Sequence, residues 1–231
     1  IAQFALKDLN ETVISGDVAA SSYSPIDKSM VMNASAYRAY LLMESYRRFG
    51  DTVYKEKATR NITFVIKNQQ HDGSWLYAVG NPQDAFIDHF HTCFVLKSLY
   101  KANQYLKSDD VRKAINKGYA YYRANLFTTD DIPKPFAKVG RIQSVKIEMY
   151  DYAEAISLGV LLKTEFPEAF SLSVKLSKDV CSKFQLPEGY FVTRVNWGGF
   201  RNKVPYLRWP QAQMFFALTN LLKEMNKTCA E

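Results

Sequence analysis

Cysteine and histidine are scarce in this sequence, with three of each among 231 residues. Cys93, Cys181 and Cys229 lack the spacing of metal ligands, and an odd number of cysteines cannot form a closed set of disulfides. The scarcity argues against a disulfide-stabilised secreted module and against a structural metal site. It favours a reduced, cytoplasmic location, and we expect neither a metal ion nor a cofactor.

Glycine, proline and long apolar runs are also sparse. Ten glycines and eight prolines exclude a collagen-like or low-complexity chain. No stretch approaches eighteen uninterrupted apolar residues, so we expect no transmembrane segment. Apolar residues make up 47% and charged residues 23% of the chain, which is typical of a globular domain with a sizeable core. We therefore expect one domain over residues 1–231.

Aromatic residues and positive charge are abundant by contrast. Fifteen tyrosines, fifteen phenylalanines and three tryptophans suit a stacked core or a cleft that binds the flat faces of sugars. The formal charge of +7 favours an acidic partner. No segment carries a continuous stripe of lysine and arginine, and no nucleic-acid-binding motif occurs, so nucleic acid is not the expected partner.

Helical periodicity dominates the chain. The first clear helix covers residues 34–49 and is followed by Gly50, a typical C-cap, and by Asp51, a typical N-cap for a second helix to about residue 69. The same pattern predicts further helices, and it lacks sustained strand alternation. These helices cover residues 85–105, 109–126, 147–165, 167–185 and 209–226, and residues 1–13 resemble the second helix of an earlier pair. The predicted class is all-α, with three complete helical hairpins and flanking half-units.

The first helices of the pairs repeat one another. Asp88–Leu99 aligns without a gap to Asp151–Leu162 and to Gln211–Leu222, and more loosely to Ala34–Ser45. The offsets are 54, 63 and 60 residues. A degenerate repeat of that length predicts an α/α toroid of helical hairpins. A tetratricopeptide or HEAT array has a shorter and more regular unit, and it is the alternative architecture.

The connections between hairpins are long, whereas those within hairpins are short. Because the chain alternates between the two kinds, all long connections and the N-termini of the first helices should lie at one end. Helix N-termini favour anions. The last two long connections, residues 127–146 and 186–208, also carry a surplus of basic residues, which are Lys134, Lys138, Arg141, Lys146, Arg194, Arg201, Lys203 and Arg208. We therefore expect an anionic ligand at this end.

Several motifs resemble known toroid proteins. Gln69–Trp75 matches the Q-x-x-x-G-x-W motif of α/α-toroid proteins, in which the glycine permits a turn and the tryptophan packs between hairpins. The longer pattern resembles uncharacterised toroid proteins found with surface-polysaccharide biosynthesis genes, from about residue 20 to about residue 220. That pattern consists of Tyr23–Asp27, Val31–Ala34, Phe86–Thr92 and Pro205–Phe215. The resemblance implies that this chain is the C-terminal part of a longer six-hairpin toroid.

More distant relatives by fold include unsaturated glucuronyl hydrolases, uronyl epimerases and acylglucosamine epimerases. The likeness implies a carbohydrate in a central cleft, and the absence of Asp-rich cyclase motifs disfavours terpene cyclisation. We expect a protein of polysaccharide biosynthesis or modification that binds an acidic, uronate-type glycan and acts as a hydrolase, epimerase or lyase. The alternatives are a non-catalytic glycan-binding or scaffold protein and, third, a helical-repeat protein-interaction module.

Asp88 and His91 are the first candidate catalytic residues. Three residues apart on one helix, they share a face and could form an acid–base pair, whereas His89 points elsewhere and cannot join His91 in binding a metal. The alternative is that Asp88 caps the helix and His91 lies in an aromatic core. Glu148 is the third candidate, because it aligns with an acidic position in the resembling proteins. Asp151 nearby is explained by the helix dipole.

Polar and aromatic residues at the starts of the first helices are the candidate substrate-binding residues. An arginine beside a tryptophan, as at Arg208–Trp209, can hold a carboxylated sugar ring by an ion pair and by stacking. The alternative makes Arg208 a surface charge and Trp209 a packing anchor. The set comprises Asn33, Trp75, Tyr77, Tyr150, Arg208, Trp209 and Gln211. We predict that these residues line one cleft together with the three catalytic candidates.

Overall fold

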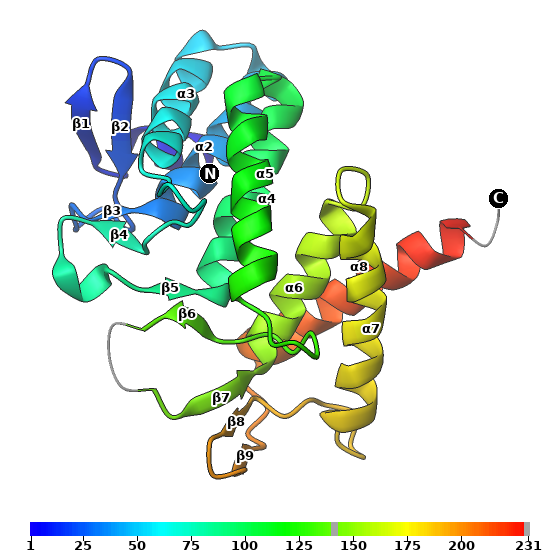
Figure 1. Ribbon diagram of the computed structural model, residues 1–231. Coiled ribbons are helices and arrows are strands. Elements are labelled where there is room, and N and C mark those ends of the chain that lie inside the picture. The colour runs from blue at the N-terminus through cyan, green and yellow to red at the C-terminus, as the bar shows by residue number, and fades with distance from the viewer. Residues whose placement is uncertain (140–142, 229–231) are drawn as a thin grey trace. The chain divides into compact units, whose positions relative to one another are not determined.

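The computed structural model describes residues 1–139 and 143–228 (Figure 1). It divides into two compact units. The first contains Ile1–Ala124 together with Lys138 and Val139, and the second contains the other described residues from Asn125 onward. Arg141 and Cys229 lie outside the described residues.

The first unit contains two of the predicted helical hairpins. They are α2 (Met32–Phe49) with α3 (Thr52–Lys67), and α4 (His89–Leu106) with α5 (Asp109–Asn125). The helix α2 packs against both α3 and α4. Gly50 adopts the left-handed conformation at φ 74°, and Asp51 accepts a hydrogen bond from the Val53 amide at 3.0 Å. The predicted stop and start between α2 and α3 are confirmed.

The N-terminal segment differs from its predicted structure. The helix α1 covers only Ala2–Lys7, and an antiparallel hairpin of β1 (Glu11–Ser15) and β2 (Val18–Ser21) follows. The prediction of a helix through residue 13 was wrong beyond α1. Thr12, Val13 and Ile14 are β-branched, a type that favours strands, and the fully buried β2 packs against α3.

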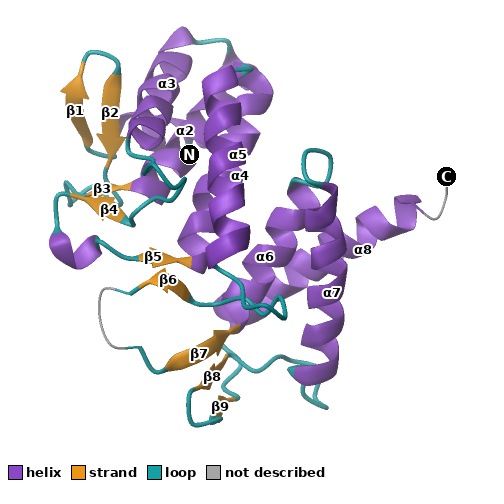
Figure 2. Cartoon of the chain, in the orientation of Figure 1, coloured by secondary structure: helices purple, strands orange, loops and turns teal. Residues whose placement is uncertain are grey.

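Short strands occupy the long connections of the first unit (Figure 2). β3 (Met30–Val31) pairs antiparallel with β4 (Ala78–Val79), so the connection before α2 and the connection after α3 lie side by side, as predicted. A short 3₁₀ helix (Pro82–Asp84) follows, and β5 (Ile87–Asp88) leads into α4. The strand β6 covers Phe136–Lys138, of which only Lys138 belongs to this unit. α4 thus begins four residues after the predicted start.

The second unit contains the third hairpin, α6 (Met149–Leu161) with α7 (Pro167–Lys183), and the last helix α8 (Ala212–Thr228). The helix α6 packs against both α7 and α8. A π turn (Leu207–Gln211) precedes α8, and within it Trp209 has extended backbone angles of φ −136° and ψ 128°. The last helix therefore begins at Ala212 and not at residue 209.

The long connections of the second unit also form a small sheet. β7 (Val145–Glu148), β8 (Arg194–Asn196) and β9 (Arg201–Asn202) form an antiparallel sheet in the order β7-β8-β9. The β7–β8 pairing brings the two long connections of this unit together, as predicted. No strands were predicted in these connections. The all-α class is nevertheless confirmed, because the strands are short and lie between the helices (Figure 2).

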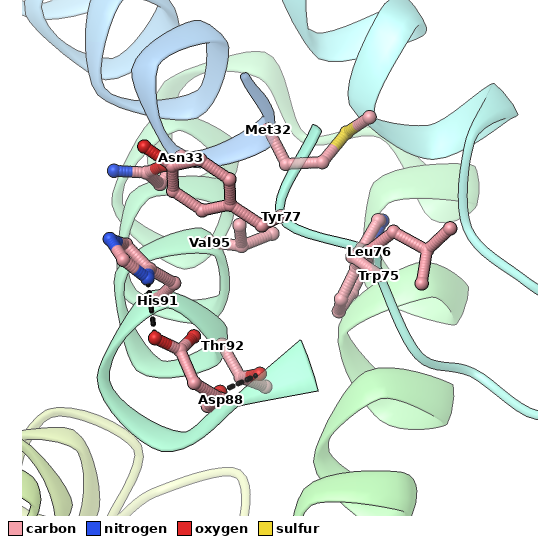
Figure 3. A pocket seen from close by; sticks show the side chains of 9 residues that line it. All are labelled: Met32, Asn33, Trp75, Leu76, Tyr77, Asp88, His91, Thr92 and Val95. Atoms are coloured by element: carbon pink, nitrogen blue, oxygen red, sulfur yellow. Dashed lines mark hydrogen bonds and ion pairs between the residues drawn. The ribbon is translucent and has the colours of Figure 1, made fainter. Parts of the chain in front are cut away.

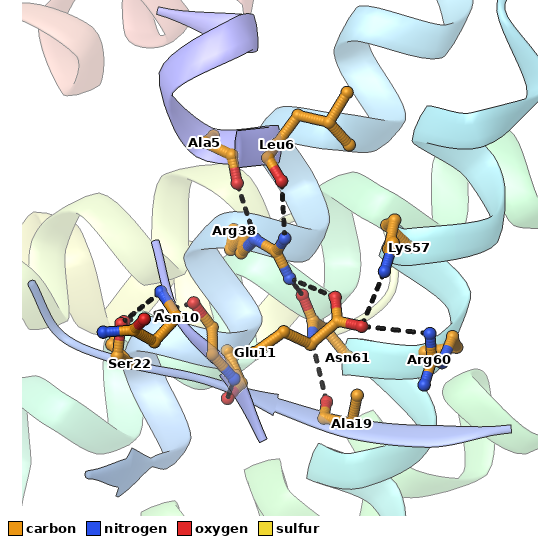
Figure 4. A network of polar contacts seen from close by, with 12 residues as sticks. Ala5, Leu6, Asn10, Glu11, Ala19, Ser22, Arg38, Lys57, Arg60 and Asn61 are labelled. Carbon is orange, nitrogen blue, oxygen red and sulfur yellow. Dashed lines mark hydrogen bonds and ion pairs between the residues drawn. The ribbon is translucent and has the colours of Figure 1, made fainter. Parts of the chain in front are cut away.

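A polar network attaches the N-terminal segment to the first hairpin (Figure 4). Arg38 of α2 is 3% exposed and donates to Glu11 at 2.9 Å, to Asn61 at 3.0 Å and to two carbonyl groups of α1. Glu11 also forms ion pairs with Lys57 at 2.7 Å and with Arg60 at 2.9 Å. The network satisfies a buried guanidinium and fixes β1 against α2 and α3.

Candidate functional site

Asp88 and His91 form a close pair at the start of α4 (Figure 3). The Nδ1 atom of His91 lies 2.6 Å from the Oδ2 atom of Asp88. Asp88 occupies the N-cap position, but its side chain makes no capping hydrogen bond. The shared helix face is confirmed, and the expected side-chain cap by Asp88 is absent. The aromatic surroundings of the alternative are present, since the His91 ring lies 4.2 to 6.5 Å from four aromatic rings, those of Phe90, Tyr77, Phe94 and Phe86. His89 points elsewhere, since its Nε2 atom lies 2.9 Å from the buried Tyr122 hydroxyl.

A small pocket surrounds this pair. It leaves about 10 Å³ of space for a water-sized molecule, roughly the room for one water or one hydroxyl group. The first unit thus brings together five of the predicted site residues. The lining residues are Met32, Asn33, Trp75, Leu76, Tyr77, Asp88, His91, Thr92 and Val95.

Asn33 contributes an unsatisfied acceptor to the pocket. The residue is 4% exposed, and its Oδ1 atom is buried without a hydrogen-bond partner among the described residues. Leaving a buried acceptor unpaired costs free energy, so such a group indicates a bound water or ligand. Figure 3 shows the Asn33 side chain beside Tyr77 and next to His91. A hydroxyl group in the pocket could donate to this oxygen.

Tyr77 borders the pocket with its ring 4.6 Å from the His91 ring, and it stacks on Phe86 at 4.8 Å. Burial raises the pKa of the Tyr77 hydroxyl, and the nearby Tyr23 and carboxyl groups raise it further. The phenol therefore stays protonated at neutral pH and can donate a hydrogen bond. The contributing carboxyl groups belong to Asp84, Asp88 and Asp27.

A turn at Ser24–Asp27 lies close enough to Tyr77 that the charge of Asp27 contributes to its raised pKa. Burial would raise the pKa of Asp27, but hydrogen bonds from Ser24 and Ser29 outweigh burial and lower it. The Asp27 carboxylate accepts from the Ser24 hydroxyl at 2.6 Å and from the Ser29 amide at 3.0 Å. With Asp84 and Asp88, it makes the surroundings of the first-unit pocket acidic. The cations at Lys146, Arg194, Arg201, Lys203 and Arg208 all belong to the second unit.

Trp75 serves the fold, as its motif predicted. It is 3% exposed, and its Nε1 atom donates to the Val65 carbonyl at 2.9 Å. Its ring packs so closely on Gly118 that a Cβ atom there would lie 2.4 Å away. These contacts leave no ring face for a sugar, so the expected stacking role of Trp75 does not fit the structure.

Glu148 lies at the N-cap position of α6 in the second unit. Its side chain is 15% exposed and forms an ion pair with Arg194 at 3.1 Å. Burial raises the pKa of Glu148 to about 7, although Arg194 opposes the shift. A carboxyl group of that pKa exchanges protons readily near neutral pH and suits general acid–base chemistry.

The aromatic pair near Glu148 consists of Tyr150 and Trp209. Their rings stack at 5.3 Å, and the Arg208 guanidinium lies 5.6 Å from the Trp209 ring. Tyr150 is 6% exposed and Trp209 is 52% exposed. The arginine–tryptophan pair is therefore present at an accessible position, with Tyr150 supporting the indole from the protein side.

Gln211 was predicted to bind substrate, but its carboxamide is used by the fold. The Oε1 atom accepts from the Phe191 amide at 2.9 Å, and the Nε2 atom donates to the Phe191 carbonyl at 2.7 Å. Arg194 was missed as the partner of Glu148. The two face each other only through the β7–β8 pairing, which the sequence pattern did not predict.

The structure thus brings the predicted site residues together in two sets. The first unit holds Asn33, Trp75, Tyr77, Asp88 and His91, and the second holds Glu148, Tyr150, Arg208, Trp209 and Gln211. That both sets line one cleft stays a prediction. Within the described residues, no group of three or more histidine, cysteine, aspartate or glutamate side chains is placed to hold a metal ion. The described helices also include none with the length and apolar character needed to cross a membrane.

Comparisons with known proteins identify similar solved structures. No family model and no curated protein sequence matches the chain. A GH76 alpha-mannanase from Bacteroides thetaiotaomicron aligns with a TM-score of 0.66 and 13% identity, over 96% of this chain and 60% of that one. An unsaturated glucuronyl hydrolase specific for heparin aligns with a TM-score of 0.63 and 11% identity, over 84% and 57%.

A sugar epimerase from a ruminal bacterium is similar to the same degree. It aligns with a TM-score of 0.68 and 11% identity, over 97% of this chain and 67% of that one. The chain thus spans 57 to 67% of the length of these three structures. At such low identity the likeness concerns the fold, and it confirms the predicted α/α-toroid class of helical hairpins.

Proposed function

We propose that this protein binds an acidic glycan and modifies it, with His91 as the proton acceptor. The observation that carries the proposal is the Asp88–His91 pair in one pocket with the unsatisfied Oδ1 atom of Asn33. Because the Asp88 carboxylate accepts a hydrogen bond from Nδ1 of His91, the proton of the neutral imidazole lies on Nδ1. The lone pair of Nε2 is then available to accept a proton from the substrate. The geometry supports a base held in one orientation beside an acceptor for a hydroxyl group.

The size of the pocket limits what enters it. With room for about one hydroxyl group, it excludes a whole sugar ring, so the ring would lie over the pocket and place one substituent inside. In this arrangement the substituent donates to Asn33 and accepts from the Tyr77 hydroxyl. His91 then takes a proton from a water molecule, or from the carbon next to a carboxylate.

The reaction classes that fit are hydrolysis, epimerisation and elimination. Each needs a base, and hydrolysis and elimination also need an acid for the leaving oxygen. Glu148 of the second unit, with its pKa near 7, has the protonation behaviour that such an acid requires. The similar structures support carbohydrate chemistry, because they are named as a mannanase, a glucuronyl hydrolase and a sugar epimerase.

The acidic character of the glycan is supported by the second unit. Arg208 beside the exposed Trp209 offers a cation and a ring face to a carboxylated sugar. The resemblance to toroid proteins of polysaccharide loci supports the further proposal that this activity belongs to the biosynthesis or modification of a surface polysaccharide in the cytoplasm.

The test uses purified protein with uronate-containing and neutral oligosaccharides and detects products by mass spectrometry. We expect turnover of uronate-containing oligosaccharides only, abolished in His91→Ala and in His91→Gln with melting temperatures near wild type. His71→Ala, which removes an exposed histidine, is the matched control and should keep full activity. Binding of the glycan without turnover by the wild type would replace the proposal with the non-catalytic glycan-binding alternative. An unchanged surface glycan in cells that lack the gene would contradict the biosynthetic role.

A further inference from the structure

Two large aromatic side chains protrude from the connection between β8 and β9. Trp197 is 66% exposed and Phe200 is 69% exposed. The turn between them is closed by hydrogen bonds from Asn196 to Phe200 at 3.0 Å and from Gly199 to Asn196 at 2.9 Å, and Gly199 has a φ of 78°. Neither aromatic residue was among the predicted site residues. A closed turn that presents exposed aromatic rings is a preformed surface for a flat ligand.

The charge around this turn is positive. The Lys146 ammonium lies 5.6 Å from the Trp197 ring centroid, and Lys203 is exposed just after β9. The sequence contains no carboxylate side chain between Glu188 and Glu224. Aromatic faces next to cations complement a sugar ring that carries a carboxylate, because the sugar ring can stack on the aromatic face and the cations attract the carboxylate.

The neighbouring arginines favour a glycan over an anionic membrane as the partner. Arg194 is paired with Glu148, and Arg201 donates to the Lys183 carbonyl at 3.1 Å and lies over the Phe184 ring. Glu148 balances the charge of Arg194, whereas Arg201 keeps its positive charge because its partners are neutral. Lys146, Lys203 and Arg201 together are fewer than the about four to eight cations typical of a segment that binds an anionic bilayer.

The turn is also continuous with the candidate site of the second unit. Glu148 faces Arg194 in the β7–β8 ladder, and Trp197 follows Arg194 by three residues. At a rise of ~3.3 Å per residue, Trp197 lies about 10 Å from Arg194 along the direction of the strand. The Trp197 amide donates to the Ser144 carbonyl at 2.9 Å, which holds the start of the turn against the segment before β7.

From these observations we propose that Trp197 and Phe200 form a distal subsite for a further sugar of an acidic oligosaccharide bound at Glu148. The inference rests on the proposed function and adds that the ligand is an oligosaccharide and not a monosaccharide. The sugar stacks on the free face of the Trp197 indole, and its carboxylate pairs with Lys146 or Lys203.

Isothermal titration calorimetry with di- and hexagalacturonate tests this subsite. We expect the wild type to bind hexagalacturonate more tightly than the disaccharide. Trp197→Ala should weaken hexagalacturonate binding by about five- to tenfold and leave the disaccharide affinity unchanged, because only the longer ligand reaches the turn. Trp197→Phe should recover part of the loss. Phe215→Ala, which removes an aromatic residue 73% exposed on α8, is the matched control.

Equal affinities of Trp197→Ala and wild type for hexagalacturonate would overturn the subsite while leaving the proposed function intact. An equal loss for both ligand lengths would also overturn it. Failure of the wild type to bind either galacturonate would contradict the acidic glycan itself. Binding to phosphatidylserine–phosphatidylcholine vesicles that is lost in Trp197→Ala, with no effect on galacturonate, would assign the turn to a membrane instead.

Discussion

The imidazole of His91 is held by the carboxylate of Asp88, with 2.6 Å between Nδ1 and Oδ2, one helical turn along α4. Asp88 occupies the N-cap position, but its carboxylate pairs with the His91 side chain and not with a backbone amide of the helix. Capping side chains are commonly worth about 1 kcal/mol to a helix. A helix end with a purely structural role is expected to keep this stabilisation. Its loss in favour of a contact that orients an imidazole is expected of a functional site.

Substitution of Asp88 by asparagine should lower turnover by about 10²- to 10⁴-fold. The amide of asparagine can present its NH₂ group to Nδ1, which would then place the proton on Nε2 and remove the base. Since asparagine is nearly the same size, the melting temperature should stay close to that of the wild type. Steady-state kinetics on the turned-over glycan measure the effect, and a rate equal to that of the wild type would remove Asp88 from the mechanism.

Substitution of Glu148 by glutamine should make stability less dependent on pH. Burial raises the pKa of Glu148 from 4.5 to about 7, so the folded protein binds this proton more tightly than the unfolded chain. The wild type should lose stability as the pH rises from about 4.5 to about 7, by up to about 3 kcal/mol. Urea unfolding at pH 5 and pH 8 measures this loss, which should be smaller in Glu148→Gln. Parallel pH profiles for the two proteins would contradict the raised pKa.

Substitution of Glu11 by glutamine should act in the opposite direction. Burial would raise the pKa of Glu11, but hydrogen bonds from Lys57 and Arg38 outweigh burial and lower it. Its stabilising contribution is therefore complete above the ordinary pKa of 4.5 and is lost as the pH falls through the lowered value. Glu11→Gln should destabilise the protein by about 2 kcal/mol at pH 7 and flatten the acid side of the stability profile. Urea unfolding between pH 3 and pH 7 is the measurement, and an unchanged slope there would exclude Glu11 as its source.

Substitution of Gly118 by alanine should destabilise the first unit by about 1–3 kcal/mol. A Cβ atom at Gly118 would lie 2.4 Å from the Trp75 ring, which is fully packed and cannot withdraw. Helix propensity alone predicts the opposite sign, because alanine is favoured over glycine within α5. Gly16→Ala is the control, since nothing lies within 4 Å of its added Cβ atom. Thermal unfolding of both variants measures the difference, and a stabilised Gly118→Ala would show that Trp75 is loosely packed.

The sequence predicted those features that depend on local chemistry. Gly50 and Asp51 mark the boundary between α2 and α3 because their backbone and side-chain preferences act within a few residues. The three-residue spacing of Asp88 and His91 likewise placed the two side chains on one helix face. Local rules were sufficient to predict the helical hairpins and the first-unit pair.

The features that were missed depend on partners distant in the sequence. Glu148 meets Arg194 only because β7 pairs with β8, and these strands are too short to show alternation. The carboxamide of Gln211 is used by the backbone of Phe191, twenty residues earlier. The β1–β2 hairpin did carry a local signal in its β-branched residues and the Gly16-Asp17 turn. That signal was overlooked because the apolar periodicity of residues 1–13 was interpreted as a helix.

The ladders between neighbouring long connections restrict how this protein could acquire new specificities. Loops of helical-repeat enzymes ordinarily tolerate insertions, which lets recognition change while the helices stay constant. Here β3 is locked to β4 and β7 to β8, so an insertion inside either pair shifts the register and turns each following side chain to the opposite face. Length variation is therefore expected to concentrate in the segments outside the ladders, such as the 3₁₀ turn at Pro82–Asp84 and the turn between β8 and β9.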